Sequence, residues 1–472
     1  MELEELRAKI GGKVTTAQDA AHQEAAAALQ WNARKSTRVP AVIVSATSVS
    51  DVQVAVRFAA ANGLRVSARG AGHNLSGIAI QDSIVIDLSR LDACQIDAGR
   101  RIAQLGPGVT NGRLAAALDA EGMAFPLGHC ASVPMSGYLL GGGLGWNSGT
   151  WGFACSRVEA VDVVMPDGAL RQATADHWPD IFWAARGGGP EFFGVIVGYK
   201  VNLEPLPRGM MSAVRVYPLD RMAELERWMA HVLHAYPRNV DVVIDLRNAP
   251  HPEDGRPVPV AAGICVVYAE TQTEAARLHK DVAALAPQDA VQAIGPMPVS
   301  FGDLYAQTEH AMPSGKRFHI DSFWAGSDAG QFVRHIAASI SQAPSLLCHS
   351  IVARYPEGRP AMPDAAFSMA APVWGSLCAI WDDAKADPEH VSWVRDGADM
   401  IGDLALGHYV GEADLQRPGR LNHCYAPAAL GKLRALQQLY DPKGLFLPVE
   451  ARPEANGKSS EALRVRTMTP AE

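Results

Sequence analysis

Glycine pairs and triplets divide the first half of the chain into short segments. Four such clusters occupy residues 70–72, 106–108, 141–145 and 187–189, each in a predicted turn. Glycine adopts backbone conformations that other residues avoid, and it lets backbone amides approach a bound group because no side chain intervenes. The elements between the clusters are therefore expected to be short, and loops from several of them are expected to surround one ligand.

Hydrophobic periodicity predicts strands and helices in alternation between these turns. The predicted strands are 41–44, 64–68, 83–88, 102–105 and 193–203, and 158–165 pairs with 169–173 as a hairpin. The predicted helices are 1–30, 50–62 with an N-cap at Ser50 or Asp51, and 111–121. This mixture is typical of an α+β module.

The pattern of predicted strands and helices changes after Pro205-Leu206-Pro207. Longer strands such as 261–268 and 319–324 alternate with helices such as 274–286, which predicts an antiparallel sheet covered by helices on one face. We predict four parts, which are a first domain, a second domain, a segment with a helix around 428–440 that packs back on the first domain, and a loose tail. Their bounds are 36–207, 208–405, 406–450 and 451–472.

Bulk properties exclude several classes of protein. The net charge of -8 over 472 residues argues against a general binder of nucleic acid or anionic membranes. No apolar run approaches the roughly 18 residues that span a bilayer, and no secretion signal is recognisable, so a cytoplasmic location is the default expectation. The seven cysteines are scattered without a CxxC pair, so neither a zinc site nor a disulfide framework is expected.

Two side chains able to bond covalently to a ligand lie in glycine-rich loops. His73 stands in the segment 69–74 and Cys130 in the segment 128–133, where the neighbouring His129 is a candidate partner for a thiolate. No glycine cluster completes the G-x-G-x-x-G pattern of a Rossmann site. An extended FAD suits four separate loops better than a small anion does, so an imidazole and a thiol together suggest a flavin held by two bonds.

Longer motifs make a resemblance specific. They are RGAGHNLSG at 69–77, GHCASVPMSGYLLGGGLGW at 128–146, WAARGGG at 183–189, YAP at 425–427 and YDPKGLF at 440–446. Residues 36–207 resemble the PCMH-type FAD-binding domain of the vanillyl-alcohol-oxidase superfamily, which has two subdomains. Within that superfamily, nearly the whole chain resembles the berberine-bridge-enzyme-like oxidases.

The resemblance implies FAD with an 8α-histidyl link to His73 and a 6-S-cysteinyl link to Cys130. Two such tethers raise the redox potential of a flavin and favour hydride transfer from poorly activated C–H bonds. A small residue at Val133 is associated in these oxidases with access of O2. The expected FAD contacts, besides the two links, are Arg69, Gly70, Ala71, Gly72, Asn74, Gly77, Val133, Gly137, Gly141, Gly142, Gly145, Val195 and Tyr425.

The expected catalytic residues are Tyr409, Glu412, Tyr138, His319 and Asp321. The family pattern Tyr-x-Asn-Tyr reads here as Tyr409-Val-Gly-Glu412, so a carboxylate stands where a tyrosine base is usual. Glu412 either takes the substrate's proton, if burial raises its pKa, or points to solvent. His319 and Asp321 share one face of a strand and either reach the pocket or form an ordinary hydrogen-bonded pair.

Together these features predict an FAD-dependent oxidase. Its substrate would be a small alcohol, amine, sugar or natural-product intermediate, and O2 would be reduced to H2O2. The alternatives are a flavin dehydrogenase with another electron acceptor and a flavin-binding protein without turnover. The oligomeric state is left open.

Overall fold

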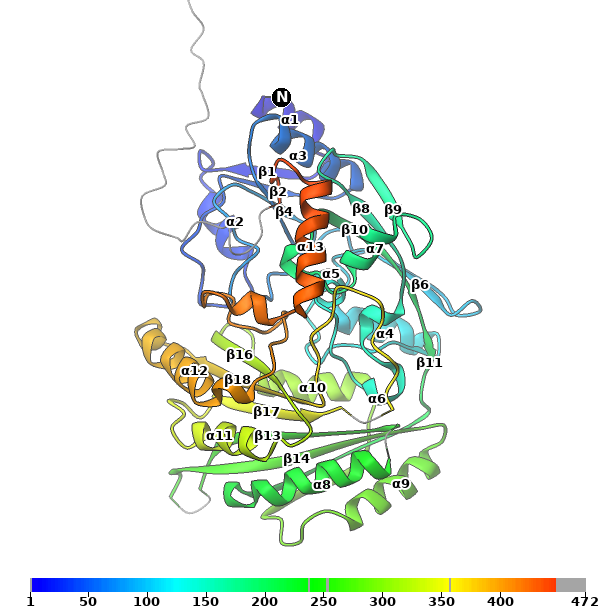
Figure 1. Ribbon diagram of the computed structural model, residues 1–472, viewed down its shortest axis with the longest axis vertical. Coiled ribbons are helices and arrows are strands. Elements are labelled where there is room, and N and C mark those ends of the chain that lie inside the picture. The colour runs from blue at the N-terminus through cyan, green and yellow to red at the C-terminus, as the bar shows by residue number, and fades with distance from the viewer. Residues whose placement is uncertain (1, 237, 252–253, 356–357, 447–472) are drawn as a thin grey trace, which may run out of the picture.

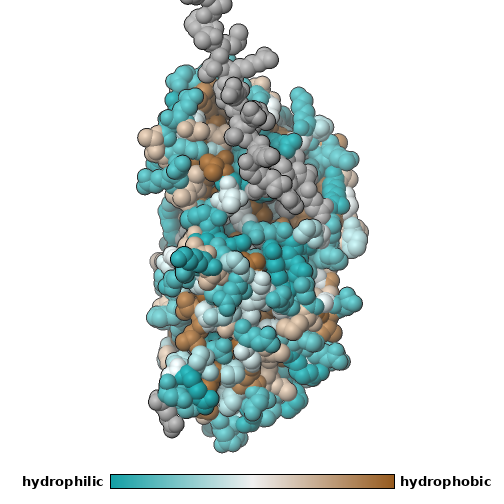
Figure 2. Space-filling view, turned by 90° about the vertical axis from the view of Figure 1, so that its left-hand side faces the viewer, coloured by the Kyte–Doolittle hydropathy of each residue, from teal (hydrophilic) through white to brown (hydrophobic). Residues whose placement is uncertain are grey.

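The computed structural model describes residues 2–236, 238–251, 254–355 and 358–446. The chain forms three principal sheets, of which the first two lie in the upper half of Figure 1 and the third in the lower half. Within the described ranges, every helix falls short of the length and apolar character that a bilayer-spanning segment needs. The face shown in Figure 2 is mostly hydrophilic, with apolar residues scattered in small groups.

The first sheet lies near the N-terminus and has the order β1-β2-β4-β3. Strands β2, β3 and β4 are parallel, whereas β1 is antiparallel to β2. The elements of this region are α1 (Leu3–Lys9), β1 (Lys13–Thr16), α2 (His22–Ala28), β2 (Val42–Ser45), α3 (Val49–Ala61), β3 (Val66–Arg69) and β4 (Ile84–Asp87).

The second sheet has five strands in the order β5-β6-β10-β8-β9, all antiparallel. Its strands are β5 (Cys94–Asp97), β6 (Ile102–Leu105), β8 (Val158–Val164), β9 (Leu170–Ala173) and β10 (Val195–Asn202), and β7 (Met123–Ala124) pairs separately with β11 (Glu204–Pro205). The helices are α4 (Asn111–Ala120), α5 (Met135–Leu140), α6 (Ser148–Trp151) and α7 (Pro179–Ala185). The predicted hairpin is confirmed as β8 and β9.

The third sheet has seven strands, all antiparallel, in the order β15-β12-β14-β13-β17-β18-β16. Its strands are β12 (Gly209–Pro218), β13 (Val240–Pro250), β14 (Pro257–Ala269), β15 (Gln292–Pro298), β16 (Arg317–Ala325), β17 (His349–Arg354) and β18 (Val373–Trp381). Helices α8 (Met222–Ala235), α9 (Gln272–Ala284), α11 (Gly330–Ile340) and α12 (Asp387–Ile401) share a buried core with one face of this sheet. Helix α10 (Phe301–Ala311) packs instead against α4.

The chain returns to the first half near its end. Helix α13 (Pro427–Tyr440) stands in front of that half in Figure 1, and the ring of Tyr440 stacks on Phe193 at 5.3 Å. The backbone N–H of Val66 in β3 donates to the carbonyl of Leu445 at 2.8 Å. The predicted α+β fold class is confirmed, whereas the bounds of the four parts stay predictions, and residues 447–472 lie outside the described residues.

The prediction of one helix over residues 1–30 is wrong. Gly11 and Gly12 end α1, and a side chain at Gly12 would meet the carbonyl oxygen of Ser45 at 1.9 Å, so this glycine allows β1 to approach β2. Helix α3 is capped two or three residues earlier than expected, because the hydroxyl of Ser48 accepts from the backbone N–H of Asp51.

Candidate functional site

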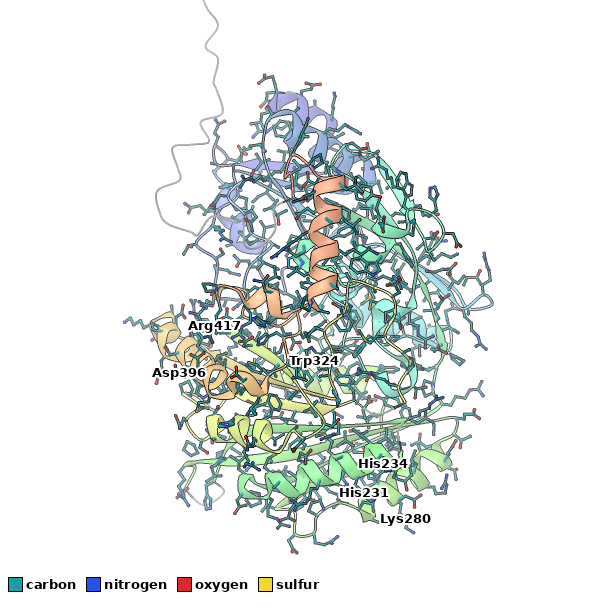
Figure 3. The ribbon with its side chains drawn as sticks, viewed as in Figure 1. His231, His234, Lys280, Trp324, Asp396 and Arg417 are labelled. Atoms are coloured by element: carbon teal, nitrogen blue, oxygen red, sulfur yellow. The ribbon has the colours of Figure 1, made fainter. Side chains whose placement is uncertain are left out.

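A cavity of about 1100 Å³ lies between the glycine-rich half and the large sheet. Its walls include the loop after β3, the segment around α5, and one face of the large sheet from β15 to β16. Trp324, labelled near the centre of Figure 3, belongs to a buried cluster with Trp374 and Tyr409, which line the cavity. Typical small-molecule sites measure roughly 300–1,000 Å³, so this cavity can hold an extended ligand.

The loop that carries His73 is fixed at its base. The guanidinium of Arg69 forms an ion pair with Asp87 at 2.7 Å and donates to the carbonyl of Leu29 at 2.8 Å. Gly72 has a φ of +72°, and a Cβ there would lie 2.0 Å from the same carbonyl oxygen of Leu29. Only glycine satisfies this turn without displacing the backbone.

His73 itself has the properties of a nucleophilic imidazole. Its ring stacks on Trp31, with 4.7 Å between ring centroids. Burial, together with the charge of Arg69, lowers the pKa of His73 to about 4, so the ring is neutral at neutral pH. Among the described residues, Nε2 of His73 is buried without a hydrogen-bond partner.

Cys130 is half-buried and lines the same cavity as His73. A hydrogen bond between His73 and the backbone of Ser132 joins the two loops. A Cβ at Gly70 would lie 2.2 Å from Oγ of Ser136, so the loops also pack closely beside this bond. His129 lines the same cavity, and its ring meets Trp146 edge-on at 5.0 Å. Its role as a partner of the Cys130 thiolate stays a prediction.

Three of the four glycine clusters reach the cavity. Gly70, Gly72, Gly141, Gly145 and Gly189 line it. The cluster at 106–108 serves packing instead, because side chains at Gly106 and Gly108 would collide with the carbonyl oxygens of Leu91 and Ser89.

The remaining expected FAD contacts divide into two groups. Those that line the cavity are Arg69, Ala71, Asn74, Gly77, Val133 and Gly137. Three others do not line it. Gly142 packs on Phe367, Val195 lies in the core beneath β3 and β4, and the hydroxyl of Tyr425 donates to the carbonyl of Gly188 at 2.8 Å. These three residues therefore pack within the protein and are not part of the cavity lining.

Tyr138 lines the cavity but its hydroxyl is engaged. The O–H donates to the carbonyl of Pro126 at 2.6 Å, and burial raises the pKa of Tyr138 well above its ordinary value. The ring packs beneath Gly128, Gly143 and Gly145. The expectation of a catalytic Tyr138 is therefore replaced by a structural contact that holds the cysteine loop.

Tyr409 and Glu412 both line the cavity. Burial and the nearby Glu412 raise the pKa of Tyr409, and its oxygen accepts hydrogen bonds from the backbone amides of Gly143 and Leu144. Burial raises the pKa of Glu412 to about 7. Of the two alternatives left by the sequence, the structure selects the one in which Glu412 faces the cavity.

His319 and Asp321 lie on the other face of β16, away from the cavity in the described structure, and Ile320 between them lines it. Nε2 of His319 lies 3.3 Å from Asp414, and Asp321 forms an ion pair with Arg420 at 2.7 Å. The expectation that they are pocket residues is corrected here. They form a buried ionic network that joins β16 to the segment after residue 405.

Three charged residues on the cavity face of the large sheet were not predicted from the sequence. Asp241, Asp245 and Arg247 alternate along β13 and line the cavity. Asp241 accepts from the backbone N–H of Asn147 at 2.6 Å and from the hydroxyl of Tyr268 at 2.9 Å, and burial raises its pKa to about 6. The period-two placement of charges in an otherwise apolar strand was a readable signal.

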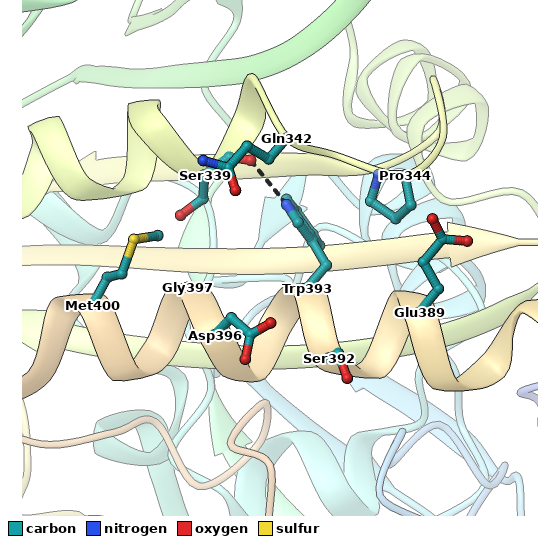
Figure 4. Close-up of a pocket in the computed structure, with 9 residues that line it drawn as sticks. All are labelled: Ser339, Gln342, Pro344, Glu389, Ser392, Trp393, Asp396, Gly397 and Met400. Atoms are coloured by element: carbon teal, nitrogen blue, oxygen red, sulfur yellow. Dashed lines mark hydrogen bonds between the residues drawn. The ribbon is translucent and has the colours of Figure 1, made fainter.

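A second hollow of about 250 Å³ lies between α11 and α12, on the helical side of the large sheet (Figure 4). Trp393 donates from Nε1 to the carbonyl of Ser339 across it, and Glu389 and Asp396 stand along its rim. No part of it joins the large cavity in the described residues. The part of the chain that the structure describes also holds no cluster of His, Cys, Asp and Glu placed to bind a metal ion.

Comparison with known proteins agrees with this geometry. Residues 40–174 match a family model described as an FAD binding domain. The chain is 27% identical to the FAD-linked oxidoreductase janO of Penicillium janthinellum over 420 residues, which cover 88% of this chain and 91% of that protein. It is 31% identical to (R)-6-hydroxynicotine oxidase of Paenarthrobacter nicotinovorans over 305 residues, which cover 61% and 64%.

Solved structures show the same fold. The 6-hydroxy-D-nicotine oxidase of Arthrobacter nicotinovorans superimposes with a TM-score of 0.79 at 22% identity, covering 93% of this chain and 96% of the other. BBE-like 1 of Physcomitrella patens gives 0.81 at 18% identity, covering 96% and 99%. The chain is an FAD-dependent oxidoreductase. More narrowly, it carries the fold of the BBE-like flavoproteins and resembles FAD-linked oxidoreductases over most of its length.

Proposed function

We propose that the chain is an oxidase that holds FAD through two covalent links, to Nδ1 or Nε2 of His73 and to Sγ of Cys130. The observation that carries this proposal is the position of His73 and Cys130 on two touching loops of one large cavity. When bound, FAD accepts a hydride from the substrate and passes two electrons to O2, which yields H2O2.

The residues around the cavity suit this cofactor. A neutral imidazole with an unengaged Nε2 can attack carbon, because its lone pair is not held by a proton or a partner. Each link would replace one C–H bond of the flavin with a C–N or C–S bond and would release two electrons and two protons, which one O2 would take up as H2O2. The glycine loops at 70–72 and 141–145 leave the cavity wall free of side chains where a flat group must lie.

Glu412 is the proposed catalytic base. Its pKa of about 7 is matched to proton transfer near neutral pH, whereas Tyr409 keeps its proton because its pKa is raised by burial. Tyr409 therefore acts as a neutral hydrogen-bonding group beside the carboxylate. Glu412 would thus take the substrate's proton, and the bound flavin would supply the hydride acceptor.

The proposed substrates are an alcohol, an amine, a sugar hemiacetal or a natural-product intermediate. Val133 lines the cavity, and a small residue at this position is associated with access of O2 in the oxidases that the chain resembles, which supports O2 as the acceptor. Reducing the protein with substrate without air and then admitting air distinguishes an oxidase from a dehydrogenase. Fast reoxidation with release of H2O2 supports the oxidase, and slow reoxidation supports a different acceptor.

Acid denaturation tests the two links. The yellow colour should stay with the unfolded chain, should stay in each of His73→Ala and Cys130→Ala, and should be released only in the double variant. Cys155→Ala is the matched control, because Cys155 is a buried free cysteine that does not line the cavity in the described residues. Release of the colour from the unmodified protein would show that neither link exists.

A further inference from the structure

One row of apolar side chains crosses the cavity face of the large sheet without interruption. The strand registers place Ile294 opposite Val214, Val214 opposite Ile264, Ile264 opposite Val243, Val243 opposite Ala353, and Ala353 opposite Trp374. The row thus runs through β15, β12, β14, β13, β17 and β18, and each of its six members lines the cavity. Polar residues lie in the neighbouring rows, not in this one.

This row is not covered by the protein. Val214, Ile264 and Val243 are only half-buried although they stand on central strands. On the opposite face, which the helices cover, the exposed fraction is 2% for Val242 and 0% for Ile244. Apolar side chains on the central strands of a sheet are normally buried when the sheet lies inside a protein. This half-exposed row is therefore a surface suited to an apolar ligand.

The two ends of the row differ in their surroundings. Its inner end is Trp374 on β18, which packs in one buried cluster with Tyr409, and Glu412 lies close enough to Tyr409 to raise the pKa of that tyrosine. Its outer end is Ile294 on the edge strand β15, where the side chain is 43% exposed. Five spacings of about 4.8 Å separate β18 from β15, so the row is about 24 Å long.

We propose that this apolar row binds the body of an elongated, mostly apolar substrate, whose single oxidisable alcohol or amine lies at Glu412. The proposal rests on the proposed oxidase function and narrows its substrate class. A free sugar is disfavoured, because its hydroxyl groups would lose water along the row without finding hydrogen-bond partners. The outer end, at the exposed strand β15, leaves the far end of a long substrate in contact with solvent.

A homologous series of straight-chain primary alcohols, from butanol to dodecanol, tests this proposal on the flavin-loaded protein. Binding is measured without air as the change in the flavin absorption spectrum, before any turnover. Each added methylene should lower the Kd about two- to fourfold, because it buries further apolar surface. A Kd that is independent of chain length would overturn the proposal.

Two matched variants locate the site. Ile264→Trp fills the row at β14, about 14 Å from β18, so the gain in affinity should stop at alcohols of about that length. Val260→Trp is the control, because it lies on the same face of the same strand but outside the cavity lining. Equal effects of the two variants would refute the assignment. Ile264→Ser, which creates no bulk, should instead weaken every long-chain alcohol.

This result is separable from the covalent links. The spectral titration requires only that FAD is bound, whereas acid denaturation reports the links themselves. A protein that releases its colour in acid but still shows the chain-length dependence retains the apolar site. A protein that keeps its colour but binds short and long alcohols equally retains the oxidase proposal and loses this one.

Discussion

Replacement of Glu412 by glutamine is the sharpest test of the proposed base. The carboxyl group has an ordinary pKa of 4.5, and burial raises it to about 7. With a pKa of about 7, about half of the protein carries the carboxylate at pH 7 and about one hundredth at pH 5, so the rate of flavin reduction should fall about 50-fold between them. An unperturbed base with a pKa of 4.5 would give a fall of less than about 1.5-fold over the same interval.

The assay is stopped-flow reduction of the bound flavin under anaerobic conditions at a saturating substrate concentration. Glu412→Gln should react about 100-fold or more slowly at pH 8 and should show no step in rate near pH 7. Glu412→Asp is the conservative control and should recover part of the rate. An unchanged pH profile in the glutamine variant would refute the assignment of Glu412 as the base.

The same carboxyl group predicts a change in stability with pH. The folded protein keeps the proton of Glu412 between pH 4.5 and about 7, whereas the unfolded chain releases it, so stability falls as pH rises across this interval. The loss amounts to about 1.4 kcal/mol per pH unit, or about 3 kcal/mol in total. Urea unfolding at pH 5 and pH 8 should show this loss, and Glu412→Gln should lack it. Parallel pH profiles in the two proteins would contradict the burial argument.

Three further changes give distinct results. Tyr138→Phe should cost about 1–3 kcal/mol in urea unfolding, because the carbonyl of Pro126 loses its donor, and should change the rate of flavin reduction by less than about twofold. Asp414→Asn should cost about 1–3 kcal/mol at pH 7, because His319 and Arg395 lose a charged hydrogen-bond acceptor, and because these two contacts lower the pKa of Asp414 against the effect of burial, the difference should narrow in acid unfolding experiments. Gly70→Ala should lower stability by about 1–3 kcal/mol and loosen the contact with Ser136, which thermal unfolding and the fraction of colour retained in acid would measure.

The parts of the fold that the sequence predicted are those determined by local chemistry. The turn at 166–168 forces a hairpin, and glycines at 70–72 and 141–145 have no alternative to tight turns, so loops and short strands were correctly placed. The residues of the two proposed links are also a local feature, because His73 and Cys130 are recognisable by residue type and motif. Their meeting in one cavity needed only that two loops of one domain converge.

The errors share a different cause, which is that a strand pattern does not reveal which face meets the ligand. Period two correctly placed His319 and Asp321 on one face of β16, yet that face packs on the closing segment, and the cavity receives Ile320. The same rule applied to β13 would have found Asp241 and Arg247. Only the position of the sheet relative to the glycine-rich half decides between the faces, and that position depends on contacts distant in the sequence.

The closing segment after residue 405 explains why the site needs both halves of the chain. It carries Tyr409 and Glu412 into the cavity, and two residues later Asp414 is held by the ionic network behind β16. Between them, the hydroxyl of Ser76, in the loop of His73, donates to the carbonyl of Ala413 at 3.2 Å. A shift of this segment would therefore move the proposed base and the histidine loop together. The ionic network behind β16 thus affects the proposed reaction through position. It holds Asp414, and Asp414 fixes the segment that carries the proposed base Glu412.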